Sequence, residues 1–409
     1  MTPDPATKAG APQLLSVAEA HARVMALASR LGTEHVPLAR AANRVLAEDV
    51  VASRAQPPFD ASAMDGYAVR AADLAPGARL TVTGESAAGA GSGTAVRPGT
   101  AIRIFTGAPL PRGADTVLIQ EDAERQGDSL IVREACGAGA NIRAAGTDFG
   151  PGDRLAAPRR LTWRDLALAA AMNAGQVTVA RRPDIALIAT GDELAMPGEV
   201  PGPDQIIASN GFGLKAMLEA AGASVRLLPI ARDTPASLAL AFDLAEGADL
   251  VVTLGGASVG DRDLVASAAT ARGLDLAFHR IAMRPGKPLL AGRLRGIPMV
   301  GLPGNPVSAL VCGRLFLRPM VEAMQGLPGN LPAPLPARLG AALEANGPRS
   351  HFLRAEVTLD PTEGWRCTPF DRQDSSLLGI LSRANALLQR PPHDPARQIN
   401  DRVDFIWLD

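Results

Sequence analysis

Hydrophobic positions follow two different periods along the chain, which predicts parts of different fold class. Between Val69 and Arg143, short apolar runs are interrupted by Gly, Pro and Asp, as in brief strands joined by turns. The clearest expected strands there are Arg79 to Val82, Ala101 to Phe105, Thr116 to Gln120 and Ser129 to Val132. We therefore expect a small, all-β unit in this stretch.

After Pro183 the pattern alternates between buried strands and helices. The expected strands are Ile185 to Ala189, Ser224 to Ile230, Leu250 to Leu254, Asp275 to Ile281 and Met299 to Gly301. The expected helices are Asn210 to Ala221, Pro235 to Glu246, Asp263 to Arg272 and Asn305 to Met324. Such alternation predicts a doubly wound parallel sheet.

Capping signals predict two more helices. Ser16 and Glu19 have the spacing of a capping box, so a helix is expected from Val17 to about Leu31. Thr162 is expected to cap a second helix, roughly Trp163 to Met172.

The C-terminal part is predicted to be a small barrel or sandwich. Gly326 to Pro336 is rich in Gly and Pro and marks a boundary, after which His351 to Leu359 and Val403 to Leu408 are the best strand candidates. The predicted organisation is a multidomain α/β chain with these parts: a disordered tail (1–15), an N-terminal linker domain (16–50 with 148–180), a small β-rich domain (51–147), a doubly wound α/β domain (181–327) and a C-terminal β-barrel domain (328–409).

Composition narrows the class of protein. The 409 residues carry a net charge of −1, so no global field attracts nucleic acid or an anionic membrane. The three cysteines, Cys136, Cys312 and Cys367, are far apart and suit a reducing compartment. The N-terminus has no apolar core typical of a signal peptide, and the five histidines show no metal-ligand spacing. A cytoplasmic protein is expected.

Three glycine-containing loops follow predicted strands and carry the candidate chemistry. They are Thr190-Gly-Asp-Glu-Leu194, Gly255-Gly-Ala-Ser-Val-Gly-Asp-Arg-Asp263 and Gly301-Leu-Pro-Gly-Asn-Pro-Val-Ser308. Open α/β sheets bind ligands at the carboxyl ends of their strands. Two of the loops combine glycines suited to phosphate with carboxylates, which repel phosphate unless a divalent cation lies between them. The pattern indicates a metal-bridged anion site.

Several motifs, in order, resemble molybdopterin molybdenumtransferases, the family of bacterial MoeA and the gephyrin E domain. Besides the loops beginning at Thr190 and Gly301, they are Phe59-Asp-Ala-Ser-Ala-Met-Asp-Gly-Tyr-Ala-Val69, Arg103-Ile-Phe-Thr-Gly-Ala-Pro109 and Met283-Arg-Pro-Gly-Lys-Pro288. The resemblance runs from Asp60 to Ser375. It implies that the doubly wound domain is MogA-like and binds molybdopterin.

The resemblance also implies an activity and its partners. Molybdate would be inserted into the dithiolene of adenylylated molybdopterin with release of AMP, and Mg²⁺ would be required. The protein would be an elongated homodimer whose active sites draw on both subunits. A molybdopterin adenylyltransferase and apo-molybdoenzymes are candidate partners, whereas nucleic acid and membrane are not.

Carboxylates are the expected metal ligands and catalytic groups. Glu193, Asp261 and Asp263 can place a divalent ion against phosphate oxygens, although helix capping or loop solvation is the alternative for each. Asp192 is the candidate loop former rather than a ligand. Asp233, at a strand end, matches an acidic position of the family and is kept as a catalytic candidate.

Glycines, a serine and a rigid turn are expected to hold the substrate. Gly255, Gly256 and Gly260 can let backbone N–H groups approach a phosphate, with Ser258 beside them. The turn before the last helix adds four more candidates, of which the asparagine is alternatively a plain N-cap: Pro303, Asn305, Pro306 and Ser308.

Basic residues are the expected molybdate ligands. Arg284 and Lys287 flank a Pro-Gly turn, and Lys287 is also a catalytic candidate; some relatives carry Lys at the first position. Arg354 and Ser375 match family positions implicated in molybdate binding. Asp374 stands where the family usually has Gly, so both Ser375 and Ser376 are candidate contacts of the anion. The anion itself is either molybdate or tungstate.

Three residues of the β-rich part are expected to matter by resemblance. Asp60 and its loop would reach the partner subunit's site, and Thr106 and Asp148 would contact the substrate. Turn formation is the alternative for Asp60, Asp65 and Asp148. The competing functions are a molybdopterin adenylyltransferase, which normally lacks the Asp60 region and the C-terminal β domain, a scaffold and an unrelated nucleotide hydrolase.

Overall fold

The computed structural model describes residues 14–256 and 264–409. The chain divides into two compact units, one made of Met1–Glu34 with Ala180–Asp409 and the other of His35–Val179. Among the described helices, none is long and apolar enough to cross a membrane. Each unit is described by itself below.

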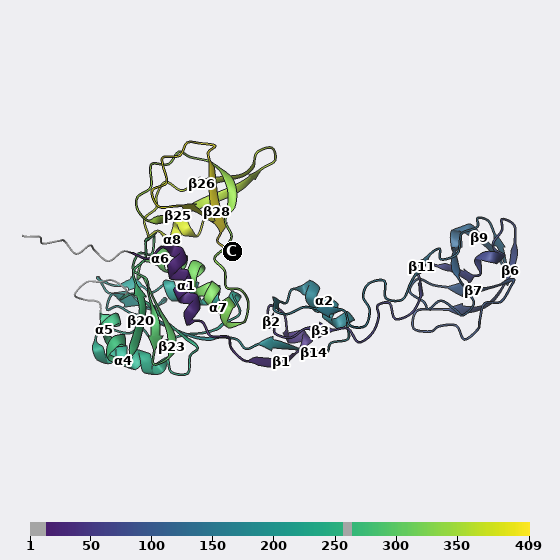
Figure 1. Ribbon diagram of the computed structural model, residues 1–409, viewed down its shortest axis with the longest axis horizontal. Helices are drawn as coiled ribbons and strands as arrows, with labels where there is room; N and C mark the ends of the chain where they lie inside the picture. The colour runs from purple at the N-terminus through teal and green to yellow at the C-terminus, as the bar shows by residue number, and fades with distance from the viewer. Residues whose placement is uncertain (1–13, 257–263) are drawn as a thin grey trace, which may run out of the picture. The chain divides into compact units, whose positions relative to one another are not determined.

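The second unit contains the predicted β-rich part (Figure 1). Its largest sheet has the strand order β8-β5-β7-β6-β10-β9. The strands are β5 (Gly66–Val69), β6 (Arg79–Ser86), β7 (Thr100–Ile104), β8 (Thr116–Ile119), β9 (Ala123–Gln126) and β10 (Ser129–Val132). The four expected strands are confirmed. The sequence analysis did not predict β5, which lies between β8 and β7 and is fully buried.

A smaller layer of the same unit surrounds the second capped helix. Helix α2 (Trp163–Ala171) begins at Thr162, whose hydroxyl caps Asp165 N in a capping box, as the sequence predicts. Its core includes Leu46, Leu161 and Val179. The short strands of this layer pair as β1-β14-β2-β13 and β3-β12: β1 (Thr33–Pro37), β2 (Val45–Leu46), β3 (Val50–Val51), β12 (Arg154–Leu155), β13 (Arg159–Arg160) and β14 (Gln176–Ala180).

The first unit is built on a six-stranded sheet of order β18-β15-β19-β23-β22-β20. The strands are β15 (Asp184–Ala189), β18 (Ser224–Leu227), β19 (Leu250–Leu254), β20 (Leu274–His279), β22 (Leu290–Leu294) and β23 (Ile297–Leu302). Along β15, Ile185 and Leu187 join one hydrophobic core, whereas Ala186 and Ile188 join another. The sheet is therefore covered on both faces, as a doubly wound fold requires.

Helices supply the two cores. Helix α3 (Asn210–Ala220) contributes Leu214 and Leu218 to the core on one face, whereas α4 (Pro235–Leu244) and α5 (Leu264–Ala271) contribute to the core on the other. The expected last helix consists of α6 (Pro306–Cys312), a π-helical turn (Gly313–Leu317) and α7 (Arg318–Met324).

Helix α1 (Val17–Leu27) has the predicted capping box, with Ser16 Oγ accepting from Glu19 N at 3.2 Å. It ends before the expected Leu31, because Ala28 is extended and Leu31 N donates to Met324 O at 2.9 Å. Its apolar face packs in the core of the first unit, although the sequence analysis grouped residues 16–50 with 148–180.

The antiparallel strand β22 is the main departure from the expected parallel sheet. It pairs antiparallel with both β20 and β23. Its turn into β23 consists of Arg295 and Gly296, both with positive φ (49° and 85°). Such two-residue turns favour Asn-Gly or Asp-Gly, so an Arg-Gly pair gives no hairpin signal in the sequence.

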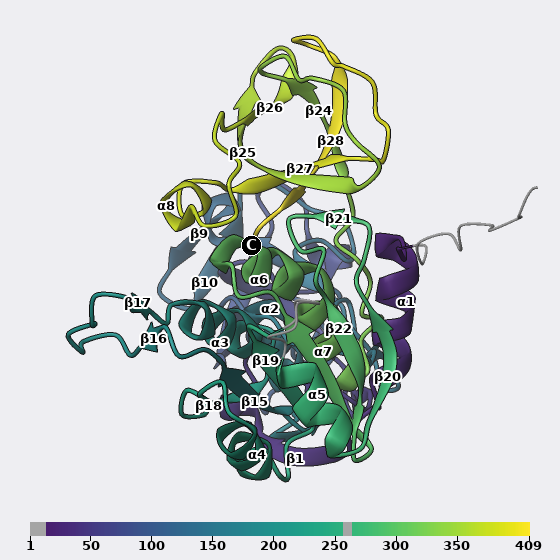
Figure 2. The same cartoon turned by 90° about the vertical axis from the view of Figure 1, so that its left-hand side faces the viewer.

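The C-terminal part forms a closed barrel, which decides between the barrel and the sandwich (Figure 2). The ring runs β25-β26-β24-β28-β27 and closes through β25–β27 pairing: β24 (Leu335–Leu339), β25 (Ser350–Asp360), β26 (Gly364–Pro369), β27 (Ala386–Arg390) and β28 (Arg402–Trp407). Strand β21 (Met283–Arg284) of the α/β domain pairs with β25. Arg314 also donates to the carbonyls of Trp407 and Leu408. The barrel is thus joined to the α/β domain by main-chain pairing.

The remaining short elements are β4 (Ala61–Ser62) paired with β11 (Ile142–Arg143), β16 (Leu194–Ala195) paired with β17 (Ile206–Ile207), and α8 (Leu378–Leu381).

Gly292 of β22 offers a test of this sheet. A Cβ at this position would lie 2.3 Å from the Asp275 carbonyl oxygen, next to the irregular register of β20. Gly292→Ala should lower the free energy of unfolding by about 1–3 kcal/mol, since backbone must move. Gly347→Ala, where a Cβ meets nothing within 4 Å, is the control. Equal stability of the two variants in urea unfolding would contradict the packing.

Candidate active site

The candidate loops meet at the carboxyl ends of β15, β19 and β23. Thr190 N donates to Leu254 O at 2.9 Å, and Gly255 N donates to Leu302 O at 3.1 Å. Asn210 Nδ2 at the start of α3 donates to Gly304 O at 2.7 Å. The loops therefore hold one another in place. They meet at the carboxyl ends of the strands, which is the edge of the sheet that the sequence predicts.

Two glycines of the central loop are required by geometry. Gly255 and Gly256 have φ of +99° and +60°. A Cβ on Gly255 would lie 2.7 Å from Thr190 O, and one on Gly256 would lie 2.1 Å from Val265 Cγ2. Close packing thus explains both glycines without a ligand. The predicted residues Ser258, Gly260, Asp261 and Asp263 lie outside the described residues.

A cavity of about 580 Å³ opens over these loops. Its walls combine the predicted residues Glu193, Pro303, Asn305 and Pro306 with apolar side chains. The apolar part comprises Leu194, Ile206, Ile207 and Leu254, and Ser376 of the C-terminal region completes the wall. This volume suits a ligand of nucleotide size, and mixed walls are typical of binding sites.

Three carboxylates lie in or near the Thr190 loop, and of these Glu193 lines the cavity. Partial burial raises the pKa of Asp233, and the charges of Asp192 and Glu193 raise it further. Asp192 Oδ1 accepts from Asp233 N at 3.2 Å, and Arg232 Nη1 donates to Asp192 O at 3.0 Å. Asp192 is therefore the loop former that the sequence suggests. Within residues 14–256 and 264–409, no three His, Cys, Asp or Glu side chains form a group that could hold a metal ion.

A second cavity, of about 260 Å³, adjoins the first and shares Pro288 and Asn305 with it. It brings together the predicted Arg284, Lys287, Ser308 and Ser375. Arg349, Gln373 and Asp374 also line it. The cavity is small and predominantly cationic, which suits a compact oxyanion.

Ser375 connects the two halves of this cavity. Asn305 Nδ2 donates to Ser375 Oγ at 2.9 Å, and Val307 N donates to Ser375 O at 3.0 Å. Although Asn305 stands at the N-cap position of α6, its side chain makes no capping bond. Ser376 Oγ instead donates to Asp374 Oδ1 at 2.6 Å. Ser375 lines the cationic cavity, and Ser376 lines the larger one.

The neighbouring Asp374 is held by two hydrogen bonds from Ser376, which lower the pKa of its carboxyl. The fully buried Arg354 donates from Nη2 to Asp374 O at 2.9 Å. Burial lowers the pKa of Arg354, and its Nε and Nη1 have no partner in the described part of the chain. Arg354 does not itself line the cationic cavity, and it is linked to the cavity through Asp374 and Gln373, which do.

Family models match most of the chain. MoeA N-terminal region (domain I and II) matches residues 15–173, the probable molybdopterin binding domain matches 186–323, and MoeA C-terminal region (domain IV) matches 336–408. Molybdopterin molybdenumtransferase 2 of Mycobacterium tuberculosis is 38% identical over 368 residues, or 87% of this chain and 90% of that protein. The chain belongs to the molybdopterin molybdenumtransferase family.

Other relatives agree. The molybdopterin molybdenumtransferase of Haemophilus influenzae is 39% identical over 72% of this chain and 73% of its own length. A crystal structure of the molybdopterin biosynthesis MoeA protein from Pyrococcus horikoshii has a TM-score of 0.82 at 30% identity and covers 97% of this chain and 100% of its own. The chain is therefore a member of a transferase family of molybdenum cofactor biosynthesis.

Three family-derived candidates belong to the second unit. Asp60 Oδ1 accepts from Ala145 N at 2.8 Å, and Asp148 N donates to Gln56 O at 3.0 Å. Thr106 donates from both N and Oγ1 to Asp65 Oδ1, which lowers the pKa of Asp65. All of these contacts join segments far apart in the sequence, so they are not the local turn contacts that the sequence left as alternatives. A part for Asp60, Thr106 and Asp148 in the molybdenumtransferase site remains a prediction.

Sequence reasoning missed four side chains around the sites. Arg232 holds the Thr190 loop through its carbonyls, whereas Arg349 and Gln373 line the cationic cavity. His351 lines a third cavity, of about 440 Å³, which shares Arg284 and Gln373 with the cationic one. Their positions next to recognised motifs could have identified two of them: Arg232 precedes Asp233, and His351 precedes Phe352-Leu-Arg354.

His351 should remain neutral at physiological pH. Burial and the nearby Arg284, Arg354, Arg390 and Arg349 lower its pKa from 6.5 to about 4. The unfolded chain binds a proton as pH falls below 6.5, but the folded chain does so only near 4. The free energy of unfolding should therefore be unaffected by this group above pH 6.5. It should fall by up to about 3 kcal/mol as the pH is lowered from 6.5 to about 4.

The prediction can be checked in two ways. An NMR titration should show the His351 ring unchanged from pH 8 to 5.5, and His351→Gln should flatten the acid-side fall in unfolding free energy. A ring midpoint above pH 6 would contradict the assigned environment.

Proposed function

We propose that this member of the family inserts molybdate into the dithiolene of adenylylated molybdopterin and releases AMP, in a Mg²⁺-dependent reaction. The observation that supports this function best is the pair of adjoining cavities that share Pro288 and Asn305. The larger one has the size and mixed polarity for a nucleotidylated pterin, and the smaller one has the charge for a tetraoxo-anion. A shared wall would bring the dithiolene and molybdate together.

Cations of the smaller cavity would bind molybdate. Arg284 and Lys287 stand on either side of Pro285 and Gly286, and a Cβ on Gly286 would lie 2.5 Å from Cys312 Sγ. The turn is therefore packed against the core, which fixes where its two basic side chains begin. Preorganised cations stabilise an oxyanion better than mobile ones because no reorganisation is needed on binding. Ser375 and Ser308 would add hydroxyl donors.

Glu193, which lines the larger cavity, and the neighbouring Asp233 fit part of a Mg²⁺ site. Mg²⁺ prefers oxygen ligands and binds through a few carboxylates together with substrate phosphates. Glu193 and Asp233 supply such oxygens. The pKa of Asp233 is raised first by partial burial and then by the charges of Asp192 and Glu193, and a bound cation would offset both effects. Asp261 and Asp263 are the further ligands we propose. Bound Mg²⁺ would polarise the phosphoanhydride that is cleaved.

The overall chemistry balances without a redox partner. Two S–Mo bonds form while one oxygen of molybdate leaves as water with the two thiol protons. One water is consumed when the phosphoanhydride is cleaved to AMP and the pterin phosphate. The large cavity would hold the AMP leaving group next to the carboxylates, where its developing charge needs a cation.

We further propose a cytoplasmic homodimer whose active sites draw on both subunits. In this arrangement Asp60, Thr106 and Asp148 would act at the partner's site. A molybdopterin adenylyltransferase would deliver the substrate, and apo-molybdoenzymes would accept the product. Family membership is the support for each of these steps.

Activity assays distinguish the proposed molybdate insertion from the rival adenylyltransferase activity. The purified protein, given adenylylated molybdopterin, molybdate and Mg²⁺, should release AMP and activate an apo-molybdoenzyme. Replacement of molybdate by tungstate tests the choice of anion. Adenylylation of free molybdopterin from ATP without molybdate-dependent AMP release would favour the adenylyltransferase instead.

Removal of a proposed metal ligand should impair catalysis without loss of the fold. Glu193→Ala or Asp263→Ala should slow AMP release by at least about tenfold. For Glu193→Ala the thermal unfolding temperature should stay near that of the wild type, because the Glu193 side chain is exposed and surface changes rarely exceed ~0.5 kcal/mol. Glu219→Ala, which removes an exposed pair with Lys215 on α3, is the control. Full activity of both variants, or full turnover under exhaustive chelation, would contradict the metal assignment.

A shared active site predicts complementation between inactive variants. Asp60→Ala and Glu193→Ala proteins should each be inactive as homodimers. After subunit exchange, about a quarter of the sites should carry both native residues and recover turnover, since half the dimers are mixed. Absence of recovery in verified mixed dimers would assign both residues to the same subunit's site.

A further inference from the structure

The cationic cavity contains one basic side chain that the family motifs did not identify. Arg284, Lys287 and Arg349 line it together, and Asp374 is its only lining carboxylate among the described residues. Asp374 Oδ1 is already bonded to Ser376 N and Oγ. No ion pair is formed by Arg284, Lys287 or Arg349 within the described part of the chain. The cavity is therefore lined by three positive charges and one negative charge, because hydrogen bonds from the neutral groups of Ser376 leave the charge of the Asp374 carboxylate in place.

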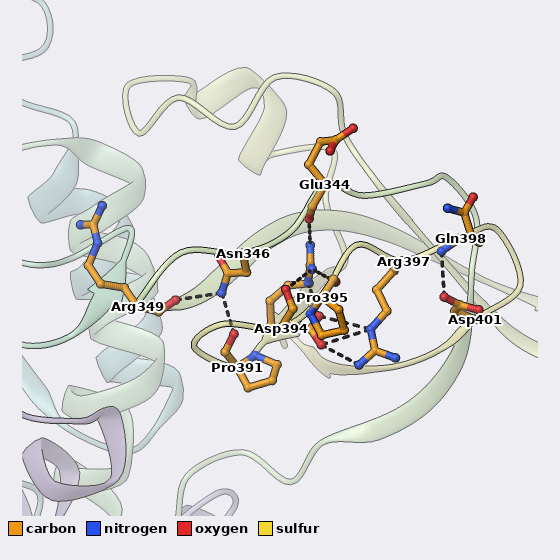
Figure 3. A network of polar contacts seen from close by, with 10 residues as sticks. Glu344, Asn346, Arg349, Pro391, Asp394, Pro395, Arg397, Gln398 and Asp401 are labelled. Atoms are coloured by element: carbon orange, nitrogen blue, oxygen red, sulfur yellow. Dashed lines mark hydrogen bonds and ion pairs between the residues drawn. The ribbon is translucent and has the colours of Figure 1, made fainter.

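Arg349 is held through its main chain rather than through its guanidinium. Asn346 Nδ2 donates to Arg349 O at 2.9 Å and to Pro391 O at 2.6 Å. Ser350, the next residue, opens β25, and its N donates to Ala282 O at 3.0 Å. The backbone on both sides of the Arg349 side chain is thus fixed. The guanidinium extends away from the Asn346 amide (Figure 3).

A buried ion network fixes the segment that leads to Arg349. Asp394 and Arg390 are 5% and 3% exposed, and Arg390 Nε donates to Asp394 Oδ2. Arg397 Nη2 donates to Asp394 Oδ1 at 2.6 Å, and Arg390 Nη1 donates to Glu344 O at 3.0 Å (Figure 3). Asn346 N in turn donates to Asp394 O at 2.8 Å. The network ties strand β27 to the segment 344–346.

Stability alone does not explain this network. Burying two charges costs several kcal/mol of desolvation, and apolar replacements of buried ion pairs are often equally stable. A fully bonded network does, however, select one geometry for the groups attached to it. Here the attached group is the loop that ends at Arg349.

We propose that Arg349 is an additional ligand of the oxyanion, and that the Asp394 network is the device that positions it. This inference rests on the proposed function. Arg349 faces the cavity from the barrel side, whereas Arg284 and Lys287 come from the α/β domain. A planar guanidinium can donate two parallel hydrogen bonds to one tetrahedral oxyanion, which a lysine cannot. Molybdate would thereby be held from both domains.

Direct binding of sodium molybdate to the full-length protein tests the ligand role. Arg349→Ala should raise the dissociation constant about tenfold, as expected for loss of charge-assisted hydrogen bonds. Arg349→Lys should recover only part of the affinity. Arg338→Ala is the matched control, because Arg338 lies on β24 of the same barrel and donates to Asn400 O. Its affinity should not change.

The outcomes separate this inference from the function on which it rests. If Arg284→Ala weakens molybdate binding and Arg349→Ala does not, the role of Arg349 is overturned and the proposed function stands. If neither variant weakens binding, the cavity is not the oxyanion site and both fail.

A double-mutant cycle tests the positioning role. Asp394→Asn should weaken molybdate binding several-fold, yet leave AMP binding unchanged. Combined with Arg349→Ala it should add nothing further, because the network acts through Arg349. Asn346→Ala provides the same test if Asp394→Asn does not fold. Additive losses, or equal losses in molybdate and AMP affinity, would show that the network has only a general structural role.

Discussion

The two hydrogen bonds of Ser375 to the start of α6 are the constraint on which the site depends. Val307 N would otherwise be an unpaired donor in the first turn, and Asn305 could have capped the helix itself. Instead the main chain of Ser375 accepts from Val307, and the Asn305 amide binds the Ser375 hydroxyl. The C-terminal segment thus replaces a local cap, which couples formation of the helix end to closure of the cationic cavity.

Acidic and basic side chains are kept apart in the site, because different elements of the fold carry them. Carboxylates at 192, 193 and 233 follow β15 and β18, whereas the basic side chains come from the turn after β21 and from the approach to β25. Among the described residues, no ion pair joins these carboxylates to these basic side chains. An anionic ligand and a cation could each find uncompensated partners there, which is a common condition for binding sites and a costly one for stability.

The sequence predicted what depends on short-range pattern. Period and capping identified α1, α2, four of the six strands of the small sheet, and the strands β15, β19 and β23 that precede the loops at Thr190, Gly255 and Gly301. Two features were not predicted. Strand β22 is joined to β23 by an Arg-Gly turn, and the π-helical turn Gly313–Leu317 interrupts the segment that was expected to be one helix. Arg349 escaped notice because nothing local distinguishes it from a surface arginine, and its importance comes from the distant Asp394.

Arg354 shows why the cationic site needs the whole barrel. Within residues 14–256 and 264–409, two nitrogens of this fully buried guanidinium have no partner, which costs free energy unless an anion or water completes their bonds. Its backbone N is bonded to Gln373 Oε1, and Gln373 Nε2 returns bonds to the carbonyls of Arg354 and Phe370. The glutamine therefore fixes Arg354 to the segment that carries Asp374 and Ser375. Because β25 is paired on both sides within a closed ring, this charge cannot move out to solvent to relieve its burial.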